Sequence, residues 1–170
     1  MSQSPTAAKP DLWRRLDESY QRGDRIGFEL AVTQFRSADV DRVALMKQAF
    51  EPGYARYRVT AICMLEYLTP AELQAIFPKL VVLASWAHGG IQRVRERLLS
   101  LPRGWVLARI ESAAEPLLTA GTDEEYRRFL ELYADLDHDL ALRLASRAAT
   151  HPDACIRDVG DEFLEELRAC

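Results

Sequence analysis

The sequence predicts an all-α fold, an α-α superhelix in which about five antiparallel helix pairs stack in series. Three observations favour this fold. The composition suits helices, apolar residues recur at three- and four-residue spacing almost throughout, and a segment pattern recurs at a period of about 33 residues. We expect a flexible start over residues 1–10 and a single domain over 11–170.

Composition and charge narrow the class of protein. The chain is 48% hydrophobic and 28% charged, which is typical of a folded, water-soluble protein and not of a disordered or membrane chain. Gly and Pro number only eight each, fewer than a turn-rich β protein needs. The net charge of -4 provides no general attraction to phosphate. The longest uncharged run, 80–92, is too short to span a bilayer, so we expect a cytoplasmic protein.

Hydrophobic periodicity and the short breaks between periodic segments predict ten helices. They are expected over 11–22, 24–36, 38–50, 54–68, 70–84, 88–101, 103–119, 122–136, 138–149 and 153–168. Two starts carry the chemistry of a capping box, in which a hydroxyl and a Glu satisfy the free amides of the first turn: Thr69 with Glu72, and Thr122 with Glu125. Connections of a few residues force consecutive helices to lie antiparallel.

An internal repeat supports a serial arrangement over a single globule. Residues 57–68 align with 156–167, which matches Leu65 with Leu164 and Glu66 with Glu165. The separation of 99 residues is three periods of 33. Weaker copies lie at 91–101 and around 126–133. Each copy is the second helix of a predicted pair, so the repeat agrees with the helix count.

The repeated segments resemble HEAT repeats. The resemblance rests on His151, Pro152 and Asp153 followed by Ile156 and Arg157, with apolar residues at helical spacing after them. It covers roughly residues 38–168, and 142–159 also resembles the leucine-rich variant repeat of bacterial proteins. The resemblance implies a stack of helix pairs whose second helices line a concave surface.

Charge differs between the predicted second helices. Segment 88–103 carries four Arg against one Glu, a net charge of +3, whereas 122–138 and 151–168 each carry a net charge of -4. A groove with a basic middle and an acidic end would orient a partner of the opposite pattern, although solvated helix faces also carry such charges. The predicted partner-binding residues are Arg56, Arg93 and Arg97 for the basic section and Asp158, Asp161, Glu162 and Glu165 for the acidic section.

Motifs that would indicate catalysis are absent from the sequence. It has no GxxxxGK[ST], GxGxxG, HExxH or GxSxG, and its three His all lie at predicted helix boundaries. Its three Cys form no CxxC pair. We therefore predict no catalytic, cofactor-binding or metal-binding residue and no enzymatic activity.

The sequence thus predicts a noncatalytic module that binds a partner protein or peptide along its concave surface, such as an adaptor in a bacterium. The alternative is a HEAT-like DNA-binding protein or enzyme similar to the bacterial alkylpurine DNA glycosylases. These use a basic concave surface with aromatic and acidic residues, and here Arg93, Arg95 and Arg97 would contact DNA. Trp86 and Trp105 flank the basic helix and could anchor a partner or fill the core. Membrane binding is not expected, and the oligomeric state is left open.

Overall fold

The computed structural model describes residues 8–37 and 41–169, and every secondary-structure element in these residues is a helix. The all-α prediction is therefore confirmed. The chain divides into two compact units, Met1–Ile76 and Phe77–Cys170, and the single domain expected over 11–170 stays a prediction. The flexible start was expected over residues 1–10. Residues 1–7 lie outside the described residues, and the first helix already begins at Ala8.

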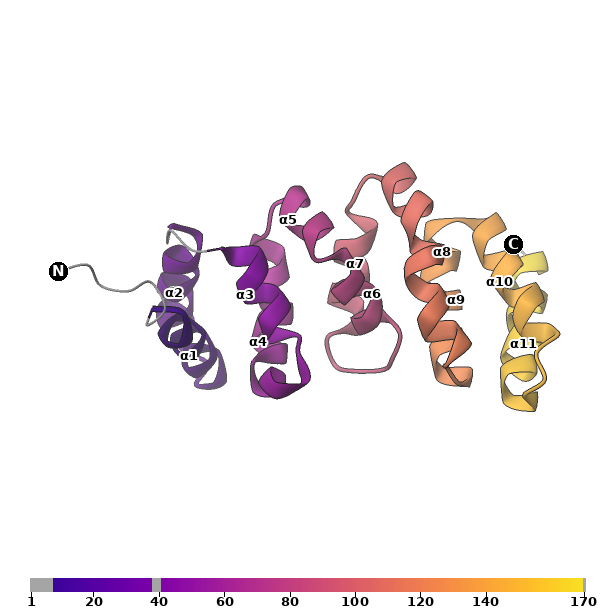
Figure 1. The fold of residues 1–170 in the computed structure, drawn as a ribbon, viewed down its shortest axis with the longest axis horizontal. Coiled ribbons are helices and arrows are strands. Elements are labelled where there is room, and N and C mark those ends of the chain that lie inside the picture. The colour runs from indigo at the N-terminus through magenta and orange to yellow at the C-terminus, as the bar shows by residue number, and fades with distance from the viewer. Residues whose placement is uncertain (1–7, 38–40, 170) are drawn as a thin grey trace. The chain divides into compact units, whose positions relative to one another are not determined.

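Unit 1 contains short helices joined by 3₁₀ turns (Figure 1). Its elements are α1 (Ala8–Gln21), α2 (Arg25–Ser37), α3 (Arg42–Ala49), η1 (Pro52–Tyr57), α4 (Arg58–Met64), η2 (Leu65–Tyr67) and α5 (Pro70–Ala75). Helices α1 and α2 form a hairpin, and α3 packs against α4 and α5. The core is built around the buried side chains of Trp13, Leu16, Phe35, Met46 and Met64.

Side chains fix two helix starts in unit 1. The Asp41 carboxylate accepts a hydrogen bond from the Ala44 amide at 2.9 Å, so α3 begins at Arg42. The predicted start of this helix at residue 38 falls among residues 38–40, which lie outside the described residues. At α5 the capping box is present, because Glu72 Oε2 accepts the Thr69 amide at 2.8 Å and Thr69 Oγ1 accepts the Glu72 amide at 3.3 Å. Each cap satisfies amides that the first turn leaves unpaired.

Unit 2 consists of three helix pairs. They are α6 (Phe77–Ala84) with α7 (Ile91–Leu99), α8 (Arg103–Thr119) with α9 (Asp123–Leu136), and α10 (His138–Ala149) with α11 (Ala154–Ala169). Contacts between pairs join α6 to α8, α7 to α9 and α9 to α11. Figure 1 shows α8 and α9 between the other two pairs of this unit. The three pairs of unit 2 therefore follow one another in space as they do in the sequence.

The closest helix packing in unit 2 requires a glycine. A Cβ atom added at Gly160 of α11 would lie 2.3 Å from the backbone nitrogen of Ala149 and 2.7 Å from the carbonyl carbon of Ala148, both in α10. Only a residue without a side chain allows the two backbones to approach this closely. The repeat alignment matches Gly160 to Ala61, which has a Cβ atom. The glycine, and the close approach that it allows, are therefore particular to the pair α10 and α11.

Two helices that were predicted to be continuous are interrupted in the structure. The helix expected over 70–84 is divided into α5 and α6 at Ile76, whose backbone angles are φ -105° and ψ 6°. Pro78 explains the break, because it has no amide to bond to the carbonyl of Gln74 and its ring crowds that turn. The helix expected over 54–68 has regular α geometry only over α4, since η1 and η2 flank it and the backbone of Tyr54 leaves the helical region.

None of the described helices combines the length and the apolar character that crossing a membrane requires.

Candidate functional site

The second helices of unit 2 form one row, because α9 contacts both α7 and α11. We call the side chains that these three helices expose the second-helix face. Each helix buries an apolar stripe, which includes Val94 and Leu98 in α7, Phe129 in α9, and Val159 and Phe163 in α11. The charged residues of the same helices therefore occupy the remaining sides, where they contact one another or solvent.

A buried guanidinium joins α7 to α9. Arg95 is only 7% exposed, and its Nη2 donates to the carbonyl oxygen of Arg128 at 2.9 Å and to Glu131 Oε2 at 2.5 Å. A charge removed from water requires such partners, because an unpaired buried guanidinium is strongly unfavourable. Arg95 is thus committed to holding two helix pairs together and is not presented to a partner.

The contact between these pairs extends through a second arginine. Arg128 Nε donates to Glu124 at 2.8 Å and its Nη1 donates to Glu131 at 2.8 Å. Glu124 also accepts the amide of Ala87, in the connection between α6 and α7, at 2.9 Å. The hydrogen bond from Arg128 lowers the pKa of Glu124, since it stabilises the charged carboxylate. Arg95 and Arg128 are therefore both paired with carboxylates of α9, and neither guanidinium is available to bind a partner.

Helices α9 and α11 are joined by a bidentate ion pair. Arg127 Nη1 and Nη2 donate to the two carboxylate oxygens of Glu162 at 2.8 and 2.7 Å. The pKa of Glu162 is lowered by this hydrogen bond, and the pKa of Arg127 is raised by the same contact. Paired hydrogen bonds of this kind fix geometry as well as charge. Glu162, predicted to bind a partner, therefore has a partner within the chain.

The other three acidic residues predicted on α11 are exposed. Together with Glu162, they stand three or four residues apart, the spacing that places residues on one side of a helix: Asp158, Asp161 and Glu165. We call these four residues the acidic row. Within the described part of the chain, Asp158, Asp161 and Glu165 form no ion pair. The row therefore carries three negative charges that no cation of unit 2 neutralises directly.

The predicted basic residues belong to different units of the chain. Arg93 is exposed on α7, and Arg97, one turn later, is half-buried with an Nε atom that has no hydrogen-bond partner among the described residues. Arg56 belongs to unit 1, where its Nη2 lies 3.6 Å from Asp17 Oδ2 and its guanidinium lies 4.7 Å from the centre of the Tyr57 ring. The partner-binding role of these residues stays a prediction.

Arg95, Arg127 and Glu131 are the residues whose role the sequence reasoning missed. A signal for them exists in the spacing of opposite charges. Arg127 precedes Glu162 by 35 residues and Arg95 precedes Glu131 by 36, which is close to the repeat period. Four further contacts link residues of unit 2 at similar separations: Ala87 with Glu124, Arg103 with Asp137, Arg143 with Glu111 and Arg147 with Glu115. Opposite charges about one period apart would have predicted the five ion pairs among these contacts.

The two tryptophans beside the basic helix make aromatic contacts within unit 2. Trp105 is half-buried and packs edge-on against Phe77, with ring centres 5.1 Å apart, and the guanidinium of Arg109 lies 4.4 Å from its ring centre. Trp86 packs against His88 with ring centres 4.5 Å apart. Both rings therefore contribute to packing around α6 and the start of α8.

Within residues 8–37 and 41–169, no group of three or more His, Cys, Asp and Glu side chains is arranged to hold a metal ion. The comparisons with known proteins add no identity: no family model matches the chain, and no curated protein or solved structure is significantly similar to it.

Proposed function

We propose that this chain is a noncatalytic interaction module, an α-solenoid of the HEAT-like kind, that binds a basic segment of a partner protein or peptide on the second-helix face of unit 2. The observation that carries the proposal is the acidic row on α11. Asp158, Asp161 and Glu165 are exposed along one side of a helix while Glu162 is held by Arg127. A row of carboxylates in a fixed register attracts and orients Lys and Arg side chains of the opposite register.

The intramolecular ion pairs supply a second reason. Arg127 holds Glu162 through both carboxylate oxygens, so α11 is fixed against α9 before any partner arrives. Side chains ordered in advance lose less conformational entropy on binding than mobile ones. The acidic row is therefore better suited to specific recognition than the same charges on an isolated helix would be.

The solenoid part of the proposal is supported by the order of contacts in unit 2. Each pair packs on the next, and ion pairs recur at separations of 32 to 36 residues. Structures whose pairs contact mainly their sequence neighbours leave one long face of second helices uncovered, and repeat proteins use that face for binding. The superhelical curvature of the whole chain is part of the proposal.

The test begins with capture of the partner by the full-length chain in an extract of the native cell, followed by measurement of affinity with the purified partner. The triple variant Asp158→Asn, Asp161→Asn, Glu165→Gln removes three exposed charges from the acidic row. We expect the dissociation constant to rise at least about tenfold, because each solvent-accessible charge pair contributes up to about 1 kcal/mol. The affinity of the wild-type chain should also fall as salt is raised.

The matched control changes net charge by the same amount elsewhere in unit 2. The triple variant Glu111→Gln, Glu115→Gln, Asp139→Asn alters exposed acidic residues of α8 and α10, outside the second-helix face. If both triple variants weaken binding equally, the partner senses net charge and the acidic row has no special role. If neither variant changes the dissociation constant, the proposed surface is wrong.

The DNA-binding alternative stays a prediction, and two observations reduce its support. Arg95, one of the three arginines it requires, is buried and bonded to Glu131. Trp13 and Asp17 lie one turn apart on α1, but they are only 3% and 6% exposed, and Asp17 accepts a hydrogen bond from Thr60 Oγ1 at 2.9 Å. An aromatic and acidic pair that is buried cannot contact a duplex.

A further inference from the structure

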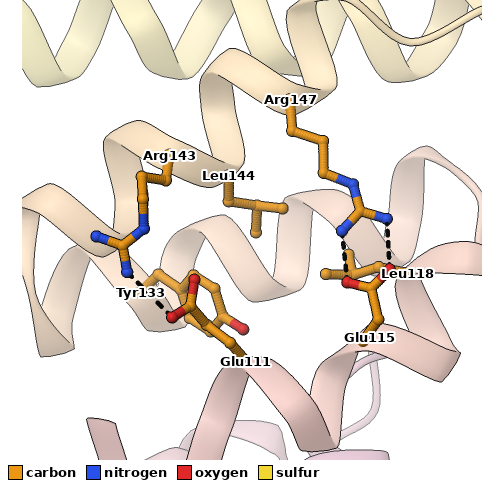
Figure 2. Close-up of a pocket in the computed structure, with 7 residues that line it drawn as sticks. All are labelled: Glu111, Glu115, Leu118, Tyr133, Arg143, Leu144 and Arg147. Carbon is orange, nitrogen blue, oxygen red and sulfur yellow. Dashed lines mark hydrogen bonds and ion pairs between the residues drawn. The ribbon is translucent and has the colours of Figure 1, made fainter. Parts of the chain in front are cut away.

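Helices α8, α9 and α10 of unit 2 line a pocket whose side chains differ from those of the second-helix face. The pocket has a volume of about 160 Å³ and lies between α8, α9 and α10 (Figure 2). Its lining combines two Glu of α8, two Arg of α10, the phenol of α9 and two leucines: Glu111, Glu115, Arg143, Arg147, Tyr133, Leu118 and Leu144. Apolar atoms form most of its wall, so the pocket suits a ligand with an apolar body.

Two ion pairs bridge the pocket, as Figure 2 shows. Arg143 Nη2 donates to Glu111 Oε2 at 3.1 Å, and one turn further along both helices Arg147 donates to the two oxygens of Glu115 at 2.6 and 3.0 Å. Each carboxylate therefore has a guanidinium, and the four charges sum to zero. A charged ligand would lose water of hydration in a mostly apolar pocket and gain no net opposite charge from its wall.

Tyr133 supplies a polar group between the two ion pairs. Tyr133 is only 2% exposed, but it lines the pocket, and its hydroxyl forms no hydrogen bond with another described residue. Figure 2 shows this hydroxyl directed into the space between Glu111 and Glu115. Burial raises the pKa of Tyr133, and the negative charges of Glu111 and Glu115 raise it further, so the group remains a neutral phenol. A hydroxyl that faces a pocket can donate a hydrogen bond to an oxygen atom of a ligand bound there.

We propose that this pocket binds a small uncharged molecule that carries one hydroxyl or carbonyl oxygen, which hydrogen-bonds to Tyr133, and an apolar body that contacts Leu118 and Leu144. The volume supports this size, because it corresponds to about five water molecules at ~30 Å³ each. The zero net charge of the lining excludes an obligatory charge on the ligand. The proposal does not depend on the acidic row, so either site can fail without the other.

Phenol is the probe, added to the full-length chain and followed by the chemical shifts of backbone amides. We expect shifts concentrated in α8, α9 and α10, with a dissociation constant on the order of 1 mM for so small a ligand. Benzoate and benzylammonium have the same ring with a negative or a positive charge. Both should bind at least about tenfold more weakly than phenol. Equal or tighter binding of either ion would overturn the proposal.

Tyr133→Phe removes the hydroxyl and keeps the ring, so the fold should persist and phenol should bind about tenfold more weakly through the loss of one hydrogen bond. Asp135→Asn, at an exposed residue of α9 that does not line the pocket, is the control and should leave phenol binding unchanged. If Tyr133→Phe binds phenol as tightly as the wild type, or if the shifts map outside the pocket, the assignment is wrong. The amide spectrum of each variant shows whether it is folded.

Discussion

The two units of this chain differ in how their helices are built and connected. In unit 1 the helices α3, α4 and α5 have only six to eight residues each, with 3₁₀ turns on either side of α4. The last two pairs of unit 2 have helices of 12 to 17 residues without such turns. Charged contacts link these two pairs about one repeat period apart. In unit 1 the contacts between helices include Arg42 with Glu72 and Thr60 with Asp17. In unit 2, opposite charges spaced one repeat period apart in the sequence correspond to helix pairs that pack in the same way. In unit 1, the 3₁₀ turns interrupt this spacing.

The largest expected loss of stability comes from a substitution where the backbones of α10 and α11 lie close together. Gly160→Ala places a Cβ atom 2.3 Å from the backbone of α10, so the two helices must separate. We expect unit 2 to lose about 3 kcal/mol of unfolding free energy, the upper part of the range for overpacked cores. Guanidinium chloride unfolding followed by circular dichroism measures this loss.

Gly104→Ala is the control for that experiment. Gly104 lies in the first turn of α8, where an added Cβ atom meets nothing within 4 Å. The change should alter stability by less than about 1 kcal/mol, in the stabilising direction, because Ala restricts the unfolded chain. Equal destabilisation by the two variants would mean that the close contact between α10 and α11 has no special importance.

Removing one partner of an ion pair between helix pairs should lower the unfolding free energy by a smaller amount. The loss should be larger for a buried ion pair than for an exposed one. Glu131→Gln removes the charge opposite Arg95, whose side chain is 9% exposed, and should cost about 1 to 2 kcal/mol of unfolding free energy. Glu111→Gln removes the charge opposite Arg143 in a pair whose side chains are 55% and 59% exposed, and should cost less than about 0.5 kcal/mol. A larger loss for Glu111→Gln, measured by the same unfolding method, would contradict the ranking.

The sequence predicts the regular part of this fold well for identifiable reasons. Helices α8, α9 and α10 begin and end within one residue of their expected bounds, because capping side chains such as Thr122 and Asp137 fix their starts. The break at Ile76 was missed although Pro78 signals it, since hydrophobic periodicity continues across the break. Local patterns such as these determine where a helix begins but not which distant helix it contacts.

The candidate site was less predictable because it depends on contacts between helices. Periodicity places Asp158, Asp161, Glu162 and Glu165 on one side of α11, and the structure agrees. It does not reveal that Glu162 pairs with Arg127 or that Arg95 is buried. Those facts depend on the register between α7, α9 and α11. Net charge per helix therefore overestimates the charge that each helix can offer to a partner.

The central claim is that the second helices of unit 2 bind the partner, and hydrogen exchange of the full-length chain with and without the purified partner tests it most directly. We expect bound partner to slow exchange in the described residues of α9 and α11 near the acidic row, while α8 and α10 exchange at their free rates. Slowed exchange confined to α8 and α10, or no change in either set of helices under saturating partner, would contradict the claim.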